Sequence, residues 1–542
     1  MTLIRFLLKE SNVSLFNLGG MAVASGMMSA VLLAIINIAA AKAADESSAT
    51  RFLFLFAIAI AIYVLAQKSL MTSSTTQVET ILNNLRQRLT DKIRQADLLP
   101  LEGIGRARIY SGVSTEIQTI SQATQPIVIA CQAAFLVAFS LVYLAWLSLA
   151  ALALMLVLTA VGLSIHFQKV REMSSYLQES FVRDNRFFEA LSHILDGFKE
   201  VKMHEPRSRD LYRYVQDASA AVADVKITIG TQFASHFAFS QATFYLVIGA
   251  IVFLLPRLNP AYSGVVMQST ATILFVFGPL TTLLGSIPLF EQGGVAVERI
   301  YDLERQLDTH VAASSEAAVD RPPLSIAKTF SRIDMESVRF QYTDQHGVPL
   351  FTVGPFDFHV RAGETIFIVG GNGSGKSTFL KLFTTLYYPL SGHIRLDGAP
   401  LTWERFPYYR NLFSIIFSDF HLFDRLYGLN DVAPARVAEL LHMLEIQDKT
   451  GFVDGRFVNQ ELSSGQRKRL ALLVTLLEER PIQVFDEWAA DQDPVFRRYF
   501  YETILTDMKR QGKTIIAATH DDRYFHVADR VLKMEYGQFV TA

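Results

Sequence analysis

The sequence has a single cysteine, Cys131, in 542 residues. An intramolecular disulfide is therefore impossible, and small folds stabilised by a cysteine framework are excluded. Cys131 lies in an apolar run, where a free cysteine behaves as a small hydrophobic side chain. Charge is scarce as well: 19% of the residues are charged and half are hydrophobic, whereas typical soluble domains carry about 25% charge. These shortages favour a membrane protein.

An excess of charge of either sign is also missing, since the formal net charge is −2. Two polar stretches are rich in Lys and Arg, but acids such as Glu79, Asp91 and Glu189 are interspersed among them. A surface that binds nucleic acid usually shows clustered positive charge. No nucleic-acid partner is therefore expected.

Long apolar runs, in contrast, crowd residues 1–290. A membrane-crossing helix needs about 20 mostly apolar residues. The runs suffice for six spans: Leu15–Ala41, Phe52–Met71, two within Pro126–Phe167 with a turn near Trp146–Ser148, Phe233–Pro256 and Val265–Phe290. The first run is too long for the core of a cleaved signal peptide. We predict an α-helical six-span transmembrane domain over residues 1–310, in which the polar stretches form long helical extensions.

The distribution of Lys and Arg predicts the orientation of this domain. The N-terminus and the stretches after the second and fourth spans hold nearly all of these residues, whereas the opposite side has only Lys42, Arg51 and Arg257. Cytoplasmic loops carry the excess of positive charge. We therefore expect the N-terminus, the two polar stretches and the C-terminal half to be cytoplasmic.

Composition changes again after residue 310. Residues 311–329 contain Ala312–Pro323, a run of small and polar residues that ends in two prolines, as is typical of a linker. Residues 330–542 have the mixture of apolar, glycine and charged residues of an α/β domain. This second domain carries the motifs with chemical meaning.

The strongest motif is Gly370–Thr378, which fits the pattern G-x-x-x-x-G-K-[ST]. It follows an apolar strand candidate, Thr365–Val369, and precedes a helical run, as a phosphate-binding loop requires. Its backbone N–H groups and the helix N-terminus favour phosphate. Lys376 is expected to contact the β- and γ-phosphates, and the Ser377 hydroxyl to bind Mg²⁺. The expected nucleotide-binding residues are Gly370, Gly371, Asn372, Gly373, Ser374, Gly375, Lys376, Ser377 and Thr378.

A second apolar strand candidate, Ile482–Phe485, ends in the acidic pair Asp486 and Glu487. An acid in this position can hold Mg²⁺, and the next one can orient or activate the attacking water. We assign Asp486 to the metal and Glu487 to the water. Between the two motifs lies Leu462–Gln466, here called the signature segment, which on its own indicates an N-capped helix and a further anion site.

The order of these motifs, closed by His520 after Thr514–Thr519, resembles the ATPase domain of ABC transporters over residues 330–542. The preceding spans resemble the membrane domain of exporters in that superfamily. The resemblance implies ATP and Mg²⁺ as cofactors. It further implies that the signature segment closes on ATP held by a second chain, so that a homodimer completes two sites.

The resemblance also assigns roles to individual residues. Tyr342 would stack on adenine, Asp493 would communicate across the dimer, and His520 would contact the γ-phosphate. The residues expected to bind ATP from the second chain are Ser463, Ser464, Gly465 and Gln466. Coupling segments that carry closure to the membrane are expected near Leu101–Arg108 and Val222–Thr231.

One departure from the family pattern concerns Ile415–Phe423. Ser418 falls where the family usually has a glutamine that links the nucleotide to the membrane domain. One hypothesis is that Ser418 or Asp419 takes over the contact with Mg²⁺ or water. The alternative is that this loop couples by packing alone.

A narrower resemblance rests on Asp486–Pro494, where D-E-W-A-A-D-Q-D-P replaces the common D-E-A-T-S-A-L-D, and on Phe417–Phe420. These runs resemble bacterial cyclic peptide and siderophore exporters of the pyoverdine, syringomycin and microcin types. The implied function is ATP-driven efflux of such peptides across the bacterial inner membrane. Alternatives are a lipid or lipopeptide flippase, an ATP-gated channel or sensor, and an importer. Polar groups in the spans are few and are expected mainly in helix packing: Gln132, His166, His236, Gln241 and Gln268.

Overall fold

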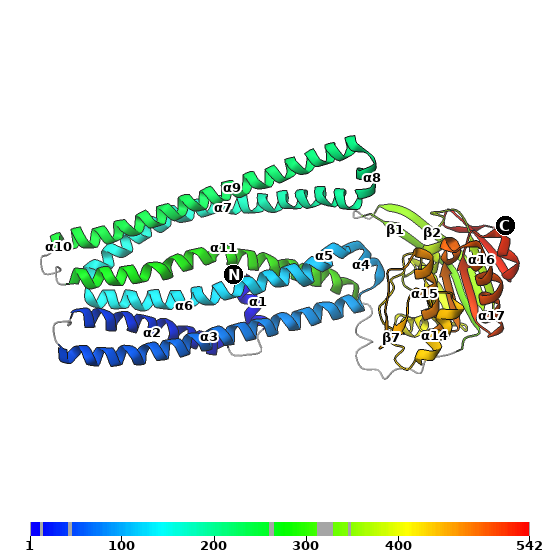
Figure 1. The fold of residues 1–542 in the computed structure, drawn as a ribbon, viewed down its shortest axis with the longest axis horizontal. Helices are drawn as coiled ribbons and strands as arrows, with labels where there is room; N and C mark the ends of the chain where they lie inside the picture. Colours follow the sequence, from blue (N-terminus) through cyan, green and yellow to red (C-terminus); the bar gives the residue numbers. More distant parts are fainter. Residues whose placement is uncertain are drawn as a thin grey trace. The chain divides into compact units, whose positions relative to one another are not determined.

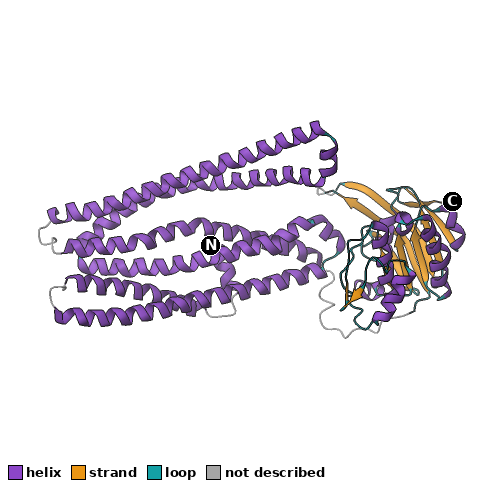
Figure 2. Ribbon diagram, in the orientation of Figure 1, coloured by secondary structure: helices purple, strands orange, loops and turns teal. Residues whose placement is uncertain are grey.

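The computed structural model describes residues 2–10, 15–41, 46–258, 265–311, 329–344 and 348–540. The chain divides into two compact units. The first comprises Met1–Gln87 and Ser111–Tyr301, and the second Arg88–Tyr110 and Asp302–Ala542. The described part of the first unit is helical, and the strands assigned among the described residues lie in the second (Figure 2). Most of the expected linker, residues 312–328, lies outside the described residues.

Helices of very different lengths build the first unit (Figure 1). They are α1 (Thr2–Glu10), α2 (Leu15–Ala41), α3 (Glu46–Gln95), α6 (Ile117–Leu147), α7 (Leu149–Asp196), α8 (Phe198–Met203), α9 (Glu205–Gly249), α10 (Leu255–Leu258) and α11 (Val266–Val311), with π-helical turns at Ser111–Glu116 and Ala250–Leu254. Helices α3 and α11 run on beyond this unit. Each of α3, α7, α9 and α11 continues well past its apolar stretch.

Five of the described helices are long and apolar enough to cross a membrane: Gly19–Ala40, Thr50–Gln95, Arg108–Leu147, Glu205–Arg257 and Val266–Asp308. The fourth expected span corresponds to a shorter apolar stretch, Leu149–Gly162 of α7. Several side chains after Gly162, that of His166 among them, lie outside the described residues, as does that of His236. The turn between the third and fourth expected spans lies at Ser148, whose hydroxyl accepts a hydrogen bond from Ala151 N at the start of α7.

Polar side chains join the helices of this unit. Gln132 of α6 donates to the Ser25 hydroxyl at 3.0 Å, and Ser25 donates to Gln67 of α3 at 2.8 Å. Asn37 of α2 contacts Thr272 of α11 at 3.2 Å. Such contacts satisfy polar groups that would otherwise face hydrocarbon. Gln132 therefore has the packing role expected of it.

The second unit contains two main sheets. The four-stranded sheet has the order β2-β1-β4-β5, and the six-stranded sheet β12-β11-β3-β10-β9-β6. Their strands are β1 (Arg332–Thr343), β2 (Pro349–Arg361), β3 (Thr365–Val369), β4 (Ser391–Leu396), β5 (Ala399–Pro400), β6 (Phe413–Ile416), β9 (Ile482–Asp486), β10 (Thr514–Ala518), β11 (Arg530–Glu535) and β12 (Gln538–Val540), with a small hairpin of β7 (Phe452–Val453) and β8 (Arg456–Phe457). Strands β6, β9, β10, β3 and β11 run parallel.

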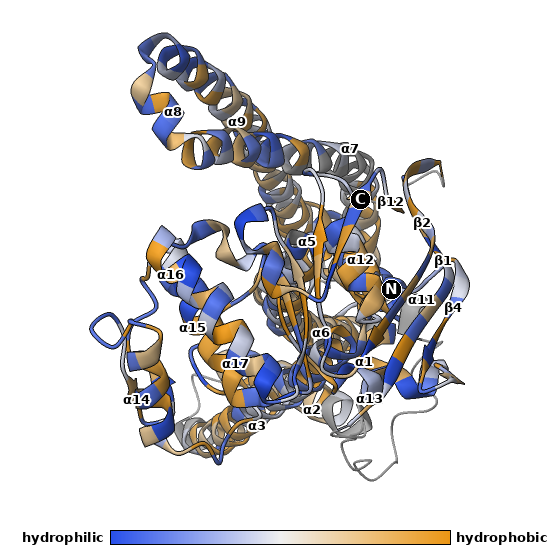
Figure 3. Cartoon of the chain, turned by 90° about the vertical axis from the view of Figure 1, so that its right-hand side faces the viewer, coloured by the Kyte–Doolittle hydropathy of each residue, from blue (hydrophilic) through white to orange (hydrophobic). Residues whose placement is uncertain are grey.

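Helices cover both faces of the six-stranded sheet, as its apolar strands require. They are α12 (Lys376–Phe383), α13 (Phe406–Arg410), α14 (Pro434–Met443), α15 (Ser464–Glu478), α16 (Pro494–Arg498) and α17 (Leu505–Arg510). Figure 3 shows α12 on one side of the strands and α14, α15 and α17 on the other. Alternating residues of one strand serve the two faces, because Ile366 and Ile368 of β3 pack with α12 whereas Phe367 packs with α15 and α17.

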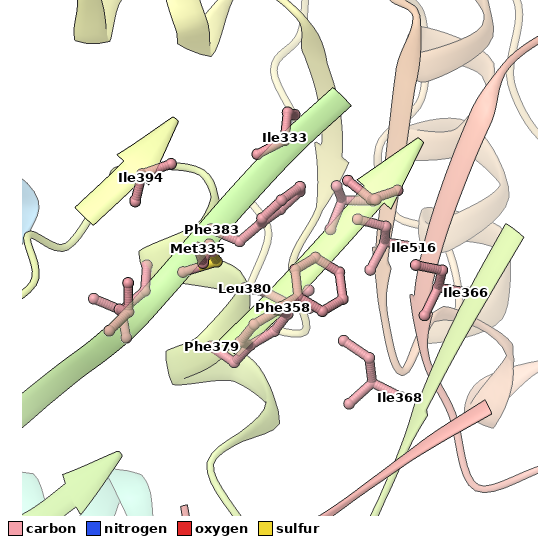
Figure 4. Packing of buried hydrophobic residues seen from close by; sticks show 14 of the residues in the cluster. Ile333, Met335, Phe358, Ile366, Ile368, Phe379, Leu380, Phe383, Ile394 and Ile516 are labelled. Carbon is pink, nitrogen blue, oxygen red and sulfur yellow. The ribbon is translucent and has the colours of Figure 1, made fainter. Parts of the chain in front are cut away.

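The core between the two sheets is rich in aromatic side chains (Figure 4). Phe379 and Phe383 of α12 contact Phe358 of β2 at ring distances of 5.0 and 5.6 Å. All three rings are almost fully buried. This packing fixes α12 on one face of the parallel sheet and thereby holds the preceding loop at the end of β3.

Residues Arg88–Tyr110 belong to the second unit. Helix α4 (Leu98–Ile104) ends at Gly105, which has a positive φ of 81°, and α5 (Arg106–Tyr110) follows. The first expected coupling segment thus lies at a break in the helices. The second, Val222–Thr231, lies inside the continuous helix α9. The chain breaks instead at α8, between Gly197 and His204, so the expected position was wrong.

Candidate functional site

The carboxyl ends of β3, β9 and β10 meet at one edge of the parallel sheet, where α/β proteins bind ligands. The loop Gly370–Gly375 follows β3, the pair Asp486–Glu487 ends β9, and His520 follows β10. Residues far apart in the sequence are thereby brought together. Helix α12 starts at Lys376 and directs its N-terminus to the same edge.

Two glycines of the loop are required by their surroundings. Gly370 has φ +156°, and a Cβ there would lie 2.2 Å from the carbonyl oxygen of Met534. Gly375 has φ +106° at the N-cap of α12, a conformation that favours glycine. The loop can therefore turn tightly only with these residues.

The ammonium group of Lys376 is almost fully buried and is shared among several partners. It donates to the carbonyl oxygens of Gly370 and Gly371 at 2.8 and 3.2 Å. It also lies 3.2 Å from Glu487 Oε1 and 3.2 Å from His520 Nε2. His520 Nε2 is in turn 3.0 Å from the same Glu487 oxygen. Lys376, Glu487 and His520, all predicted site residues, thus form one cluster.

Glu487 has a left-handed backbone, with φ 50° and ψ 36°. Non-glycine residues seldom adopt this region, and those that do are concentrated at functional sites. Its N–H donates to Ala518 O of β10 at 3.0 Å. Burial by itself would raise the pKa of its carboxyl, but hydrogen bonds with Lys376 and His520 outweigh that effect and lower the pKa. Glu487 is thus kept ionised, as a group that accepts a proton or orients water must be.

Asp486 is buried at the end of β9. Neither of its carboxylate oxygens has a hydrogen bond of good geometry among the described residues. Burial raises the pKa of the Asp486 carboxyl. The neighbouring Ser377 and Ser418 lower this pKa by a smaller amount, so the pKa stays above its usual value. A buried carboxylate with unused lone pairs beside a hydroxyl offers the oxygen ligands that Mg²⁺ prefers. Asp486 and Ser377 therefore fit the expected metal.

A cavity of about 560 Å³ opens over the loop. Residues 372–378, Ser418 and Glu487 line it together with Tyr342 of β1 and Phe351 of β2. The Tyr342 hydroxyl shares a hydrogen bond of 3.2 Å with the hydroxyl of Thr378. Sequence reasoning missed Phe351, which pairs with Tyr342 across the two strands. Of the two alternatives in the Ile415–Phe423 loop, Ser418 lines the cavity and Asp419 does not.

The signature segment begins α15 and does not line this cavity among the described residues. Ser463 caps the helix: its hydroxyl accepts from Gln466 N, and the Gln466 side chain accepts from Ser463 N. Gly465 is required by a close approach, because a Cβ there would lie 2.8 Å from Asp491 O. Ser463, Ser464 and Gln466 are at least partly accessible. One chain therefore does not bring these predicted residues to its own phosphate-binding loop.

Asp493 caps α16 by accepting from Val495 N and Phe496 N. Its hydrogen bond from Phe496 N and the nearby Arg469 guanidinium, 2.7 Å away, lower its pKa.

The residues on either side of His520 are held by Tyr501. Its hydroxyl contacts Thr519 Oγ1 at 2.6 Å and Asp521 at 3.1 Å. Tyr501 is far from His520 in sequence, and no motif pointed to it.

The chain is similar to known transport proteins. A family model described as ABC transporter matches residues 353–490. The ATP-binding protein SyrD of Pseudomonas syringae pv. syringae is 34% identical over 472 residues, which cover 85% of this chain and 82% of that protein. The ATP-dependent lipid A-core flippase of Ralstonia nicotianae is 27% identical over 369 residues, covering 64% of this chain and 59% of that protein.

The fold also has a close match among solved structures. The structure of a bacterial Atm1-family ABC exporter with ATP bound is similar with a TM-score of 0.75. The match covers 98% of this chain and 95% of that one, at 18% sequence identity.

Proposed function

Because the chain belongs to the ABC transporters of the exporter type, we propose that it works as a homodimer that exports amphipathic peptides, such as cyclic peptides or siderophores, across the bacterial inner membrane. The membership confirms the resemblance found in the motifs and the predicted fold class. The C-terminal domain binds ATP and is an ATPase coupled to transport. The cargo class, the dimer and the orientation are parts of the proposal.

The likeness to SyrD carries the cargo proposal. Its 472 matched residues exceed the length of the ATPase domain, so the likeness extends into the membrane half. Cargo is selected there, whereas the ATPase motifs are common to transporters of many cargoes. The six apolar runs contain one charged residue, Lys68. Walls of this composition suit a cargo with a large apolar part.

The cluster at the sheet edge supports a hydrolytic cycle. The loop N–H groups and Lys376 hold the phosphates, and Ser377 and Asp486 would hold Mg²⁺, whose charge neutralises phosphate oxygens. Glu487 orients the attacking water, and His520 lies within hydrogen-bonding distance of Glu487 to fix its position. The presence of all these groups in one cluster argues against a sensor or channel that has lost catalysis.

The accessible signature segment supports the homodimer. Ser463 and Gln466 cap α15 with each other, and Ser463 and Ser464 are exposed. The helix N-terminus is therefore accessible to an anion. ATP bound to the phosphate-binding loop of a second copy can place its phosphates there. A symmetric dimer then has two equivalent sites.

A lipid or lipopeptide flippase is the second candidate, because lipid A-core flippases of several bacteria are similar over half of the chain or more.

ATP hydrolysis by the full-length protein in lipid nanodiscs distinguishes the peptide exporter from the flippase. We would titrate cyclic peptides, acylated siderophore precursors and phospholipids, with Glu487→Gln as the inactive control, in which turnover should fall at least about 100-fold. Stimulation by a peptide or siderophore supports the proposal. Stimulation by lipid alone favours the flippase, and no ATP hydrolysis in the wild type contradicts both.

A further inference from the structure

Lys468 is a buried cation without a role in the ATP site described above. It lies on the second turn of α15, and its side chain is 9% exposed. Its ammonium donates to the backbone carbonyl of Glu487 at 2.9 Å. It also forms an ion pair with Asp491 at 2.9 Å. Buried lysines need such partners, because desolvation penalises an unpaired charge.

The carbonyl that Lys468 binds belongs to the residue with the left-handed backbone. Such a conformation persists only where neighbouring groups hold it. Ala518 O fixes the N–H of Glu487, and Lys468 fixes its carbonyl. The direction of the Glu487 side chain, which leaves the same Cα, therefore depends on α15 as well as on the sheet.

A second contact returns from the catalytic loop to the helix. The indole Nε1 of Trp488 donates to the carbonyl of Lys468 at 2.8 Å. The indole is buried, and its ring lies 4.1 Å from that of Phe500. Trp488 thus binds the backbone carbonyl of Lys468, and Lys468 binds the backbone carbonyl of Glu487, the residue before Trp488. We call this reciprocal pair of contacts the Lys468–Trp488 clamp.

Neighbouring contacts strengthen the same connection. Gln492 donates to the carbonyl of Gly465 at 3.0 Å and accepts from Arg469 at 2.9 Å. Together with the clamp, these bonds join the first turns of α15 to residues 487–493. A displacement of the signature segment therefore cannot leave the backbone of Glu487 unaffected.

We propose that the Lys468–Trp488 clamp is a positioning device through which the signature segment of each chain controls Glu487 of the same chain. The inference rests on the proposed homodimer. There the signature segment contacts ATP of one site, while Glu487 of the same chain serves the other. The clamp thus makes hydrolysis at each site depend on ATP in both.

The first experiment is the ATP dependence of hydrolysis by the full-length protein in nanodiscs. The wild type should show a Hill coefficient above 1. Lys468→Met should bring it towards 1 and lower kcat about tenfold, because one charge-assisted hydrogen bond is lost. Lys468→Arg, which keeps the charge and donors, should recover much of the effect. Lys449→Met, an exposed lysine after α14, is the matched control and should behave as the wild type.

Mixed dimers then distinguish positioning from damage to the helix. Two differently tagged chains are co-purified, and one carries Glu487→Gln, so a single site works. Lys468→Met on the chain with intact Glu487 should reduce turnover, whereas Lys468→Met on the Glu487→Gln chain should not. The reverse pattern, or a wild-type Hill coefficient of 1, overturns the clamp proposal but leaves the exporter standing. Absence of ATP hydrolysis in the wild type contradicts the exporter itself.

Discussion

Ser418 occupies the position where a longer polar residue was expected. It lines the cavity above the phosphate-binding loop and faces Asp486, whereas Asp419 is exposed and outside the lining. Ser418→Ala should therefore lower ATP turnover by about 3–10-fold, the effect of one hydrogen bond of about 1 kcal/mol or slightly more. Asp419→Ala is the matched control and should retain wild-type turnover. Equal rates in all three proteins would contradict the contact and favour coupling by packing.

The proposed assignment of Asp486 to Mg²⁺ predicts that the magnesium requirement depends on pH. Burial raises its pKa above the usual value of about 3.9, so protons compete with the metal at a higher pH than for an exposed aspartate. The Mg²⁺ concentration for half-maximal turnover should rise as the pH falls from 7 towards 5. Ser377→Ala removes the strongest influence that lowers this pKa, and should increase the requirement at every pH by about 10-fold or more. A requirement independent of pH would contradict the assignment of Asp486 to the metal.

At the scale of elements, helix α4 contacts side chains next to the nucleotide site within the second unit. Glu102 of α4 pairs with Lys381 of α12 at 3.0 Å and accepts a hydrogen bond from Tyr387. Tyr387 packs edge-on against Tyr342, whose ring is expected to meet adenine. A connected path of three side chains therefore leads from the base to α4.

Breaking this path should separate hydrolysis from its stimulation by cargo. In Glu102→Gln and Tyr387→Phe we expect basal ATP hydrolysis within about twofold of the wild type, because neither residue contacts phosphate, and a clear loss of stimulation. The measurement is the ratio of stimulated to basal rate in nanodiscs. Tyr536→Phe, a highly exposed tyrosine, is the control. Retained stimulation in both variants would show that α4 does not sense the nucleotide.

Elements with local signals were predictable from the sequence, and contacts between distant residues were not. The strand, loop and helix around Gly370–Thr378 follow from glycine positions and apolar periodicity within about 20 residues. The Trp488 contact with Lys468 depends on how α15 packs on the sheet, and no local pattern specifies it. Phe351 was missed for the same reason, since its place depends on the register of β1 with β2. The expected coupling segment at Val222–Thr231 was placed by family analogy, and the local signal for a break at Gly197 was overlooked.

At the scale of the whole molecule, the arrangement of charge predicts a sidedness that can be tested. In a Cys131→Ala background, single cysteines would be placed at Arg257 and at Met203, which is 87% exposed. A thiol reagent that cannot cross membranes should label Arg257→Cys in intact cells, because the proposed orientation places the basic segments in the cytoplasm and Arg257 on the opposite side. Met203→Cys should react only after the cells are opened. The opposite labelling would reverse the proposed orientation and with it the direction of export.

The clamp also has an optical consequence. The chain contains three tryptophans, and the buried one, Trp488, directly follows Glu487. Trp146 and Trp403 are exposed at 76% and 45% and can be replaced by phenylalanine. The remaining indole emits from a dry environment one residue away from Glu487, with its N–H bound to α15. Its emission maximum and lifetime would then report each closure of the ATP site in real time, without an attached dye.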